Sequence, residues 1–191
     1  ARGRRGTGEV RSVSYSVPVG SLDFWEARLE AHGVAGVMRD DWFGADCLDF
    51  EAPDGDEFRL VERGFDQRAP FLRGGTGDAA IRGFDGVTLT LAEIESTAEI
   101  LQAMGYRRDG VDGAVTRFRL PDHNGAGLVD LELAPDQPKA VEGAGSVHHI
   151  AFAVKDRAAQ NKVREAMLAL GQKVTHVFDR NYFFAIYFRT P

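Results

Sequence analysis

One pattern of elements recurs along this chain of 191 residues. It consists of an alternating strand, a helix that ends at a glycine, and further β-prone segments separated by turns. The glycines that close the helices are Gly33, Gly105 and Gly171, and each follows a similar stripe of apolar residues. A repeated unit of this kind indicates a modular architecture. The sequence therefore predicts an α+β protein built from repeated βαβββ modules.

The repeat divides the chain into three modules. The first two are expected at about 11–62 and 83–135, with a Gly-, Arg- and Pro-rich linker at 63–82, and the third at 146–191. A four-stranded unit with one helix leaves one sheet face uncovered, so such modules are expected to pair into curled, barrel-like mixed sheets. The third module lacks its last strand, and both ends of the sequence look cut. We therefore expect an original set of four modules in two paired barrels.

Composition narrows the class of protein. The net charge of −6 argues against nucleic acid or an anionic membrane as a partner. No apolar run approaches the roughly 18 residues of a membrane span. The single cysteine, Cys47, cannot form an internal disulfide and excludes a Cys-rich zinc site. We expect a soluble, cytoplasmic protein that binds neither nucleic acid nor a membrane, and leave open whether it forms a homo-oligomer.

Two of the five histidines, His148 and His149, stand side by side at the start of the predicted strand at 146–154. Large apolar side chains alternate with alanines along this strand, and the alanines share the parity of His149. A histidine followed on its own face only by alanines has open space in front of it, as a metal ligand beside a substrate requires. A histidine on a strand is nevertheless more often a packed or edge residue. The ligand interpretation therefore depends on the rest of the chain.

The repeated modules and this motif together resemble the vicinal oxygen chelate superfamily, which has the glyoxalase and bleomycin-resistance fold. The third module is similar to the hydroquinone-type ring-cleaving dioxygenases within it. The segments that carry this similarity are Val147-His148-His149-Ile150-Ala151-Phe152, Asp179-Arg180-Asn181-Tyr182-Phe183 and Ala185-Ile186-Tyr187-Phe188-Arg189. Residues 8–18 and the helix at Asp23-Phe24-Trp25 also fit this branch. The resemblance covers essentially the whole chain.

The resemblance implies an Fe(II) ion held by two histidines and one glutamate, which leaves positions for substrate and dioxygen. By motif, His149 is the metal ligand in this chain. The other histidine and the glutamate would lie before Ala1 and after Pro191. Manganese, zinc and nickel are alternatives to iron, because such a donor set does not by itself choose the metal.

The resemblance also assigns catalytic roles to His148, Arg180 and Tyr187. His148 would carry a proton near the metal, although a regular strand points it away from His149, and a surface or packing role is an equal alternative. Arg180 and Tyr187 would steady the phenolic substrate, because a guanidinium and a phenol can both hydrogen-bond to a phenolate oxygen. Without the resemblance, Arg180 would be read as a solvated surface charge and Tyr187 as a ring in the barrel core. The family usually has a polar pair at Phe184-Ala185, which puts the identity of the substrate in doubt.

The first two modules lack the metal-binding pattern. Gly86 stands at the ligand position of the second module, and a serine lies near it in the first. At the place of the glutamate, these modules have Arg59 and Asp130. Asp130 is expected to be structural, because no histidine lies opposite it. Residues 11–135 are therefore predicted to form a non-catalytic barrel, and His32, His123 and His176 to have no role in the site.

These inferences predict an oxidoreductase of aromatic-compound degradation. It would be an Fe(II)-dependent, extradiol-type dioxygenase whose ligands are dioxygen and a hydroquinone or related phenol. Two alternatives remain, because this fold hosts several reactions. One is a glyoxalase-like isomerase that uses zinc or nickel. The other is a non-catalytic protein that binds small aromatic molecules.

Overall fold

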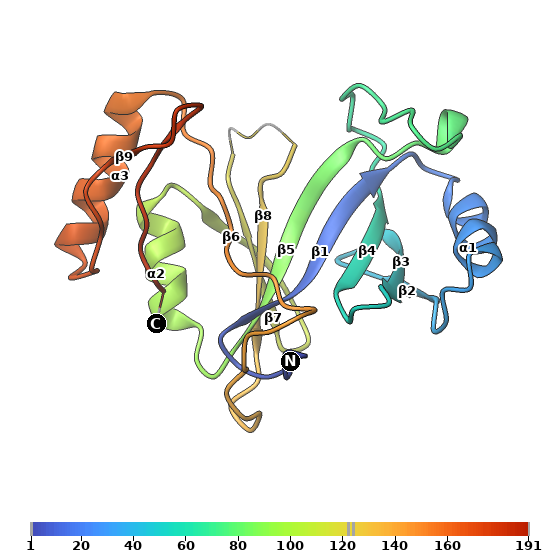
Figure 1. Cartoon of the computed structure of the whole chain (residues 1–191), viewed down its shortest axis with the longest axis horizontal. Coiled ribbons are helices and arrows are strands. Elements are labelled where there is room, and N and C mark those ends of the chain that lie inside the picture. The colour runs from blue at the N-terminus through green and yellow to red at the C-terminus, as the bar shows by residue number, and fades with distance from the viewer. Residues whose placement is uncertain (1, 122, 124, 191) are drawn as a thin grey trace.

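A computed structural model describes residues 2–121, 123 and 125–190. The first two modules form one continuous, curled sheet of eight strands in the order β2-β3-β4-β1-β5-β8-β7-β6 (Figure 1). The first module contains β1 (Glu9–Val17), α1 (Leu22–Ala31), β2 (Met38–Asp41), β3 (Asp46–Glu51) and β4 (Glu57–Glu62). The second contains β5 (Gly83–Leu91), α2 (Glu95–Ala103), β6 (Arg107–Asp112), β7 (Val115–Arg119) and β8 (Leu128–Leu133).

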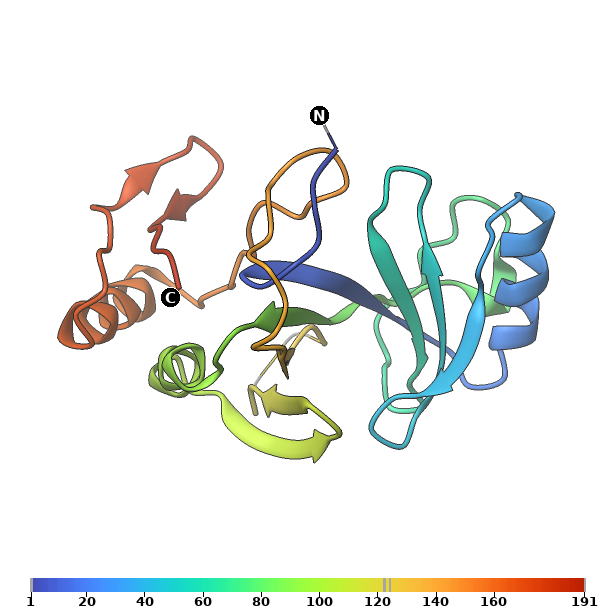
Figure 2. The same cartoon turned by 90° about the horizontal axis from the view of Figure 1, so that it is seen from below.

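The two modules have the same internal topology and meet through their first strands. In each, the first strand runs parallel to the last, β1 beside β4 and β5 beside β8. Strands β1 and β5 then pair antiparallel and join the two halves into one sheet. Figure 2 shows the helices α1 and α2 at opposite ends of this sheet. The architecture confirms the predicted α+β fold of paired βαβββ modules.

Each module has its own hydrophobic core, where its helix packs on its strands. The core of the first module consists of Val17, Leu22, Trp25, Leu48 and Leu60. The core of the second consists of Leu91, Ala98, Leu101, Tyr106, Phe118, Val129 and Leu131. Burying one large apolar side chain of this kind contributes about 1.5–3 kcal/mol. The alternation that predicted the strands is thus the alternation that fills these two cores.

The linker between the modules contains one short 3-10 helix, at Gly77–Ala79. Trp25 of α1 donates its indole N–H to the carbonyl of Ala79 at 2.8 Å, which ties this helix to the first module. No helix in the described part of the chain is long and apolar enough to cross a membrane.

The third module is held to the second mainly by its helix. This helix, α3 (Arg157–Ala169), begins at Asp156, whose carboxylate accepts a hydrogen bond from the Ala159 backbone N–H at 2.8 Å. It packs beside α2, and Phe152, just before it, packs against the core of the second module. A second attachment comes from the N-terminal segment, where Val10 of β1 forms an antiparallel bridge with Val147. The start of the third module is therefore fixed on both sides.

The predicted strands of the third module are mostly not formed, which corrects that part of the sequence interpretation. In the predicted strand at 146–154, only Val147 makes a β-bridge to another described residue. The predicted strands at 173–178 and 182–188 shorten to β9 (Phe178–Asp179) and β10 (Phe184–Ala185). A strand needs hydrogen-bonded neighbours for its backbone N–H and C=O groups. Within the described residues, none of the eight strands of the sheet supplies them to residues 148–154.

Candidate active site

The imidazole rings of His148 and His149 are in contact with each other and do not point to opposite sides of the backbone. The Nδ1 atoms of His148 and His149 lie 3.1 Å apart, and their rings are 87° from parallel. A regular strand would send consecutive side chains to opposite faces. The histidines were expected on opposite faces only if the strand is regular at its start, and the backbone at this point is not a strand. At this distance one imidazole donates a hydrogen bond to the other, and which ring donates depends on the tautomers.

A complete metal site is not present among these residues. No group of three or more His, Cys, Asp or Glu side chains in the described part of the chain could hold a metal ion. His149 is exposed, with His148 as its neighbour, and none of the described carboxylates is bound to either ring. An iron site of two histidines and a glutamate thus needs donors that these residues do not bring together.

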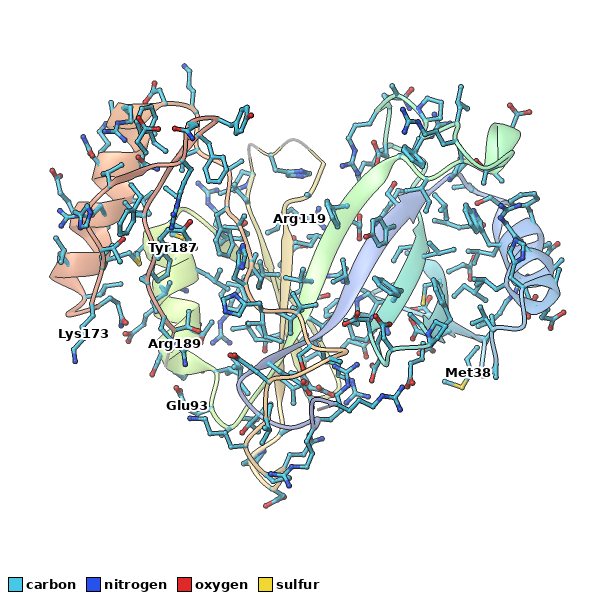
Figure 3. All side chains as sticks on the ribbon, in the orientation of Figure 1. Met38, Glu93, Arg119, Lys173, Tyr187 and Arg189 are labelled. Carbon is cyan, nitrogen blue, oxygen red and sulfur yellow. The ribbon has the colours of Figure 1, made fainter. Side chains whose placement is uncertain are left out.

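The second half of the predicted site lies around β9 and β10. Arg180 belongs to the turn that joins these two strands, and Tyr187 lies in the segment after β10 (Figure 3). The Arg180 guanidinium carbon lies 5.5 Å from the centroid of the Tyr187 ring and 5.0 Å from that of Phe178. Because Arg180 sits in the turn outside the regular strand, its side chain and that of Tyr187 reach the same side. The structure therefore brings these two predicted residues together.

Arg180 carries a positive charge that is not paired within the described residues. Its guanidinium contacts the faces of two aromatic rings, and no carboxylate of the described chain lies within ion-pair distance of it. An arginine over a ring face keeps its N–H donors free at the edge of its own plane. Arg180 can therefore hydrogen-bond to an anionic oxygen brought by a ligand.

Phe178 and His176 belong to the same group of side chains, although the sequence interpretation gave neither a role. The rings of His176 and Phe178 lie 4.2 Å apart, and those of Phe178 and Tyr187 lie 6.0 Å apart. That His176 has no role in the site stays a prediction, although its ring contacts that of Phe178. No sequence motif marks either residue, and they join Arg180 in one row of side chains, at residues 176, 178 and 180, through packing.

The Phe184-Ala185 dipeptide, where the family usually has a polar pair, lies on β10. The Phe184 ring faces α3, where the guanidinium carbon of Arg157 lies 4.2 Å from its centroid. Its carbonyl accepts a hydrogen bond from Gln160 Nε2 at 2.8 Å. The Phe184 ring therefore packs on the helix and away from the row formed by residues 176, 178 and 180.

The histidine pair and the Arg180–Tyr187 pair remain separate. Within the described residues, no hydrogen bond, ion pair or ring contact joins one pair to the other. Each of the four predicted side chains is exposed. They thus form two partial surfaces on the third module.

Two buried arginines form ion pairs inside the paired modules, away from the predicted site residues. Arg59 and Arg117 make two-point ion pairs with Asp49 and Asp130, at 2.6–2.7 Å and 2.7–2.8 Å. Asp130 also accepts a hydrogen bond from the indole N–H of Trp42 at 2.9 Å. Since both of its oxygens are bound, Asp130 is structural, as expected.

Trp42 and Phe43 were not identified from the sequence. They lie in the tight turn after β2, where Phe43 has a positive φ of 54°. Their rings cover the two buried arginines, with Arg59 3.6 Å from the Trp42 centroid and Arg117 3.8 Å from that of Phe43. This turn of the first module therefore closes over β7 and β8 of the second.

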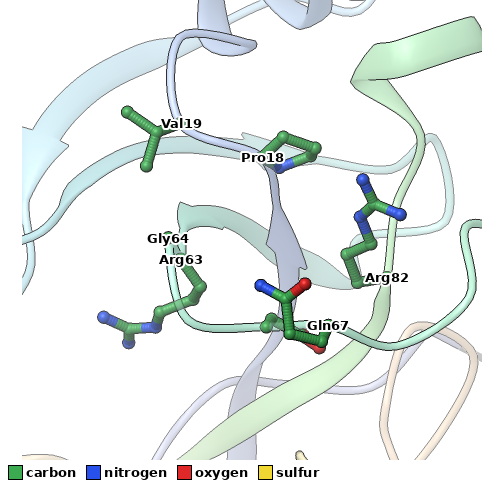
Figure 4. A pocket seen from close by; sticks show the side chains of 7 residues that line it. Pro18, Val19, Arg63, Gly64, Gln67 and Arg82 are labelled. Carbon is green, nitrogen blue, oxygen red and sulfur yellow. The ribbon is translucent and has the colours of Figure 1, made fainter.

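Two hollows on the described surface lie away from the predicted site residues. One of about 290 Å³ is formed by the first module and the linker, and none of the predicted site residues lines it (Figure 4). Its lining includes Pro18, Val19, Arg63, Gln67 and Arg82.

The lone cysteine, Cys47, is fully buried in the first module, and burial raises its pKa to about 12. A thiol with this pKa is a poor nucleophile near neutral pH.

Comparison with known proteins gives a consistent set of relatives. No family model matches the chain. It is 39% identical over 186 residues to "Putative ring-cleaving dioxygenase MhqO" of Bacillus subtilis, a match that covers 96% of this chain and 59% of that protein. It is 32% identical over 201 residues to the chlorohydroquinone/hydroquinone 1,2-dioxygenase of Sphingobium indicum, with 99% of this chain and 61% of that protein covered. The chain thus spans about three fifths of the length of these relatives.

Solved structures agree with this similarity. The crystal structure of a "putative dioxygenase" from Bacillus subtilis superposes with a TM-score of 0.90 at 38% identity, and the match covers 99% of this chain and 61% of that one. Glyoxalase I from Zea mays has a TM-score of 0.57 at 16% identity, with 92% of this chain and 60% of that one covered. The second likeness concerns the fold alone.

Proposed function

Since the chain belongs to the vicinal oxygen chelate superfamily, we propose that the whole protein is a ring-cleaving dioxygenase that acts on a hydroquinone or a related phenol. The observation that supports this most directly is the meeting of Arg180 with Tyr187. An unpaired guanidinium beside a phenol, on a face lined by aromatic rings, suits a planar ring that carries an ionised hydroxyl group. Of the two relatives described above, one is named a "Putative ring-cleaving dioxygenase" and the other a chlorohydroquinone/hydroquinone 1,2-dioxygenase.

In this proposal each of the four predicted side chains has a defined task. Arg180 and Tyr187 hydrogen-bond to the phenolate oxygen of the substrate and stabilise negative charge that develops on it. His148 holds a proton at its Nδ1 atom, which lies 3.1 Å from the Nδ1 atom of His149. His149 is the one metal ligand that these residues offer, and the remaining donors are expected outside the described residues.

The metal and the type of ring cleavage are also proposals. We propose Fe(II), which supplies the activation of dioxygen when bound, with manganese, zinc and nickel as alternatives. Ring cleavage is proposed to be of the extradiol type. The ring then opens beside a hydroxyl-bearing carbon, and both atoms of dioxygen enter the product.

The experiment is oxygen consumption by the whole protein. The protein is purified anaerobically, loaded with ferrous iron, and mixed with hydroquinone in an oxygen electrode. We expect one dioxygen to be consumed per hydroquinone, and expect His149→Ala to abolish this uptake. Metal analysis of the purified protein distinguishes an iron enzyme from a zinc- or nickel-dependent isomerase. Absence of oxygen uptake with all hydroquinones and catechols tested would contradict the proposal.

One observation favours a second function, the binding of small aromatic molecules without turnover. The described residues contain aromatic rings around a free cation but no set of three metal donors. Such a protein would bind a hydroquinone stoichiometrically and consume no oxygen under any metal. Isothermal titration calorimetry beside the oxygen electrode separates these two functions.

A further inference from the structure

We propose that Phe178 is a positioning residue that holds the Arg180 guanidinium ready for an anionic oxygen of the substrate. This inference rests on the proposed function, because it concerns the same aromatic face. Phe178 is not among the residues that the family resemblance singles out. Its role follows from its contacts in this structure.

Phe178 is the shared neighbour of the side chains on this face. Its ring lies 4.2 Å from that of His176 and 6.0 Å from that of Tyr187, and the Arg180 guanidinium carbon lies 5.0 Å from its centroid. His176, Phe178 and Arg180 form a row through these contacts, because the Phe178 ring lies between the His176 ring and the Arg180 guanidinium. Tyr187 comes to this row from the segment after β10. Removing the Phe178 ring would therefore remove the one surface that touches all three other side chains.

The backbone of this turn is already fixed by hydrogen bonds. The Arg180 N–H donates to the carbonyl of Phe183 at 2.9 Å, and the Tyr182 N–H donates to the carbonyl of Arg180 at 2.8 Å. Asn181 between them has a positive φ of 68°, and its N–H donates to the Asp179 carboxylate at 2.8 Å. The remaining freedom of Arg180 thus lies in its long side chain, which points from a defined turn.

An aromatic ring can restrict this side chain without using its hydrogen bonds. A carboxylate partner would occupy the N–H donors of Arg180 and neutralise its charge, whereas a ring face attracts the cation and leaves those donors free. Phe178 and Tyr187 are the two rings that contact this guanidinium. Tyr187 has its own proposed contact with substrate through its hydroxyl group. Phe178 has no polar group to offer, so its contribution is to hold Arg180.

The same two-stranded ribbon offers a matched control on its other face. Phe184 of β10 is paired with Asp179, the residue between Phe178 and Arg180, so its side chain points to the opposite side. Its ring contacts the guanidinium of Arg157 on α3, with 4.2 Å between the guanidinium carbon and the ring centroid. Phe184→Leu thus disrupts a second arginine–phenylalanine stack of the same ribbon, but one that faces the helix.

The test is a double-mutant cycle in the whole protein, with two readouts. The first is kcat/KM for oxygen uptake with hydroquinone, and the second is the dissociation constant for 4-nitrophenolate, followed by its absorbance under anaerobic conditions. We expect Phe178→Leu to weaken both by about fivefold, since it removes a cation–π contact of an exposed arginine. Phe178→Tyr, which keeps the ring, and Phe184→Leu should each stay within about twofold of the wild type.

The cycle separates positioning from a loss of fold. Phe178→Leu should have no further effect once Arg180 is replaced by Gln, because the group that it positions is then absent. An equal loss on Phe178→Leu in the Arg180→Gln protein overturns the role of Phe178, as does a wild-type value for Phe178→Leu itself. Binding of 4-nitrophenolate with the expected coupling but no oxygen uptake would overturn the dioxygenase proposal and support the role of Phe178. Failure of the wild type to bind the probe and to consume oxygen would overturn both.

Discussion

Five arginines of the described residues lie over aromatic rings, and three of them show how the two regions of the molecule use this contact differently. Inside the paired modules, Arg59 and Arg117 stack on Trp42 and Phe43 and also make two-point ion pairs with aspartates. On the third module, Arg180 stacks on rings alone. Arg117 is 3% exposed, whereas Arg180 lies at the surface. Arg59 and Arg117 are therefore structural because each is paired with a carboxylate. Arg180 has no such partner among the described residues, so its N–H groups are free for a ligand.

The largest expected effect concerns the buried pair. Arg117→Gln leaves the carboxylate of Asp130 buried without its ionic partner, and breaking such a pair costs about 3–5 kcal/mol of the free energy of unfolding. Urea denaturation followed by circular dichroism measures this loss. The control is Arg119→Gln on the same strand, because Arg119 pairs with Asp109 at the surface and an exposed pair contributes about 0–1 kcal/mol. Equal losses in the two variants would mean that burial does not distinguish these arginines.

The same substitution on the third module should have the opposite signature. Arg180→Gln removes a charge that contacts only ring faces, so the free energy of unfolding should change by no more than about 0.5 kcal/mol. The value of kcat/KM for hydroquinone should fall about 100-fold, because one stabilising donor for the developing oxyanion is lost. Oxygen uptake and urea denaturation of the whole protein measure the two quantities. A destabilised but fully active Arg180→Gln protein would reverse the comparison.

A smaller effect is expected where the two modules touch through Trp42. Trp42→Phe keeps an aromatic ring near Arg59 but removes the indole N–H that donates to Asp130. The loss of a hydrogen bond to a charged acceptor costs about 1.5–3 kcal/mol. The midpoint of thermal unfolding measures this cost. The control is Phe43→Leu in the same turn, because this variant keeps the hydrogen bond from Trp42 to Asp130. If Phe43→Leu destabilises more than Trp42→Phe, ring contact outweighs the hydrogen bond at this turn.

The sequence predicted the fold because its signals are local. Each helix that closes at a glycine and each alternating strand is specified by neighbouring residues, and the order of these elements determines how the modules pair. The partners of Trp42 could not be predicted in this way, since Asp130 lies 88 positions away in the sequence. The His148–His149 contact was missed for a related reason. An alternating segment adopts a regular strand only when a neighbouring strand pairs with it, and sequence periodicity does not show whether that neighbour is there.

The sequence therefore predicted which residues belong to the site, but it did not predict how they are arranged in space. Arg180 and Tyr187 were identified by resemblance, and their contact follows from the turn at Asn181, which places Arg180 outside the strand. Phe178 and His176 carry no motif. They enter the group through packing, which only the three-dimensional arrangement reveals.

The smallest expected effect concerns an arginine of an intermediate kind, Arg68 of the linker. It pairs with Asp66 at 2.6 Å, and its hydrogen bonds hold the pKa of Asp66 well below the usual range. Ser16 also donates a hydrogen bond to this carboxylate, at 2.6 Å. Because the pKa is lowered in the folded state, ionised Asp66 stabilises the protein above about pH 4, the pKa of an unfolded aspartate. This stabilisation is lost as the pH falls from there toward the lower pKa of the folded state.

Asp66→Asn should accordingly reduce the free energy of unfolding at pH 7 by no more than about 1 kcal/mol, since Arg68 is partly exposed to solvent. The difference between variant and wild type should shrink as the pH falls below about 4, because the Asp66 carboxylate of the unfolded chain then takes up a proton while that of the folded protein is still ionised. Urea denaturation at a series of pH values measures it. A difference that is independent of pH would assign the effect to the hydrogen bond from Ser16, which the amide oxygen of an asparagine can still accept. In that case Arg68 would join Arg180 as a cation whose charge the fold does not need.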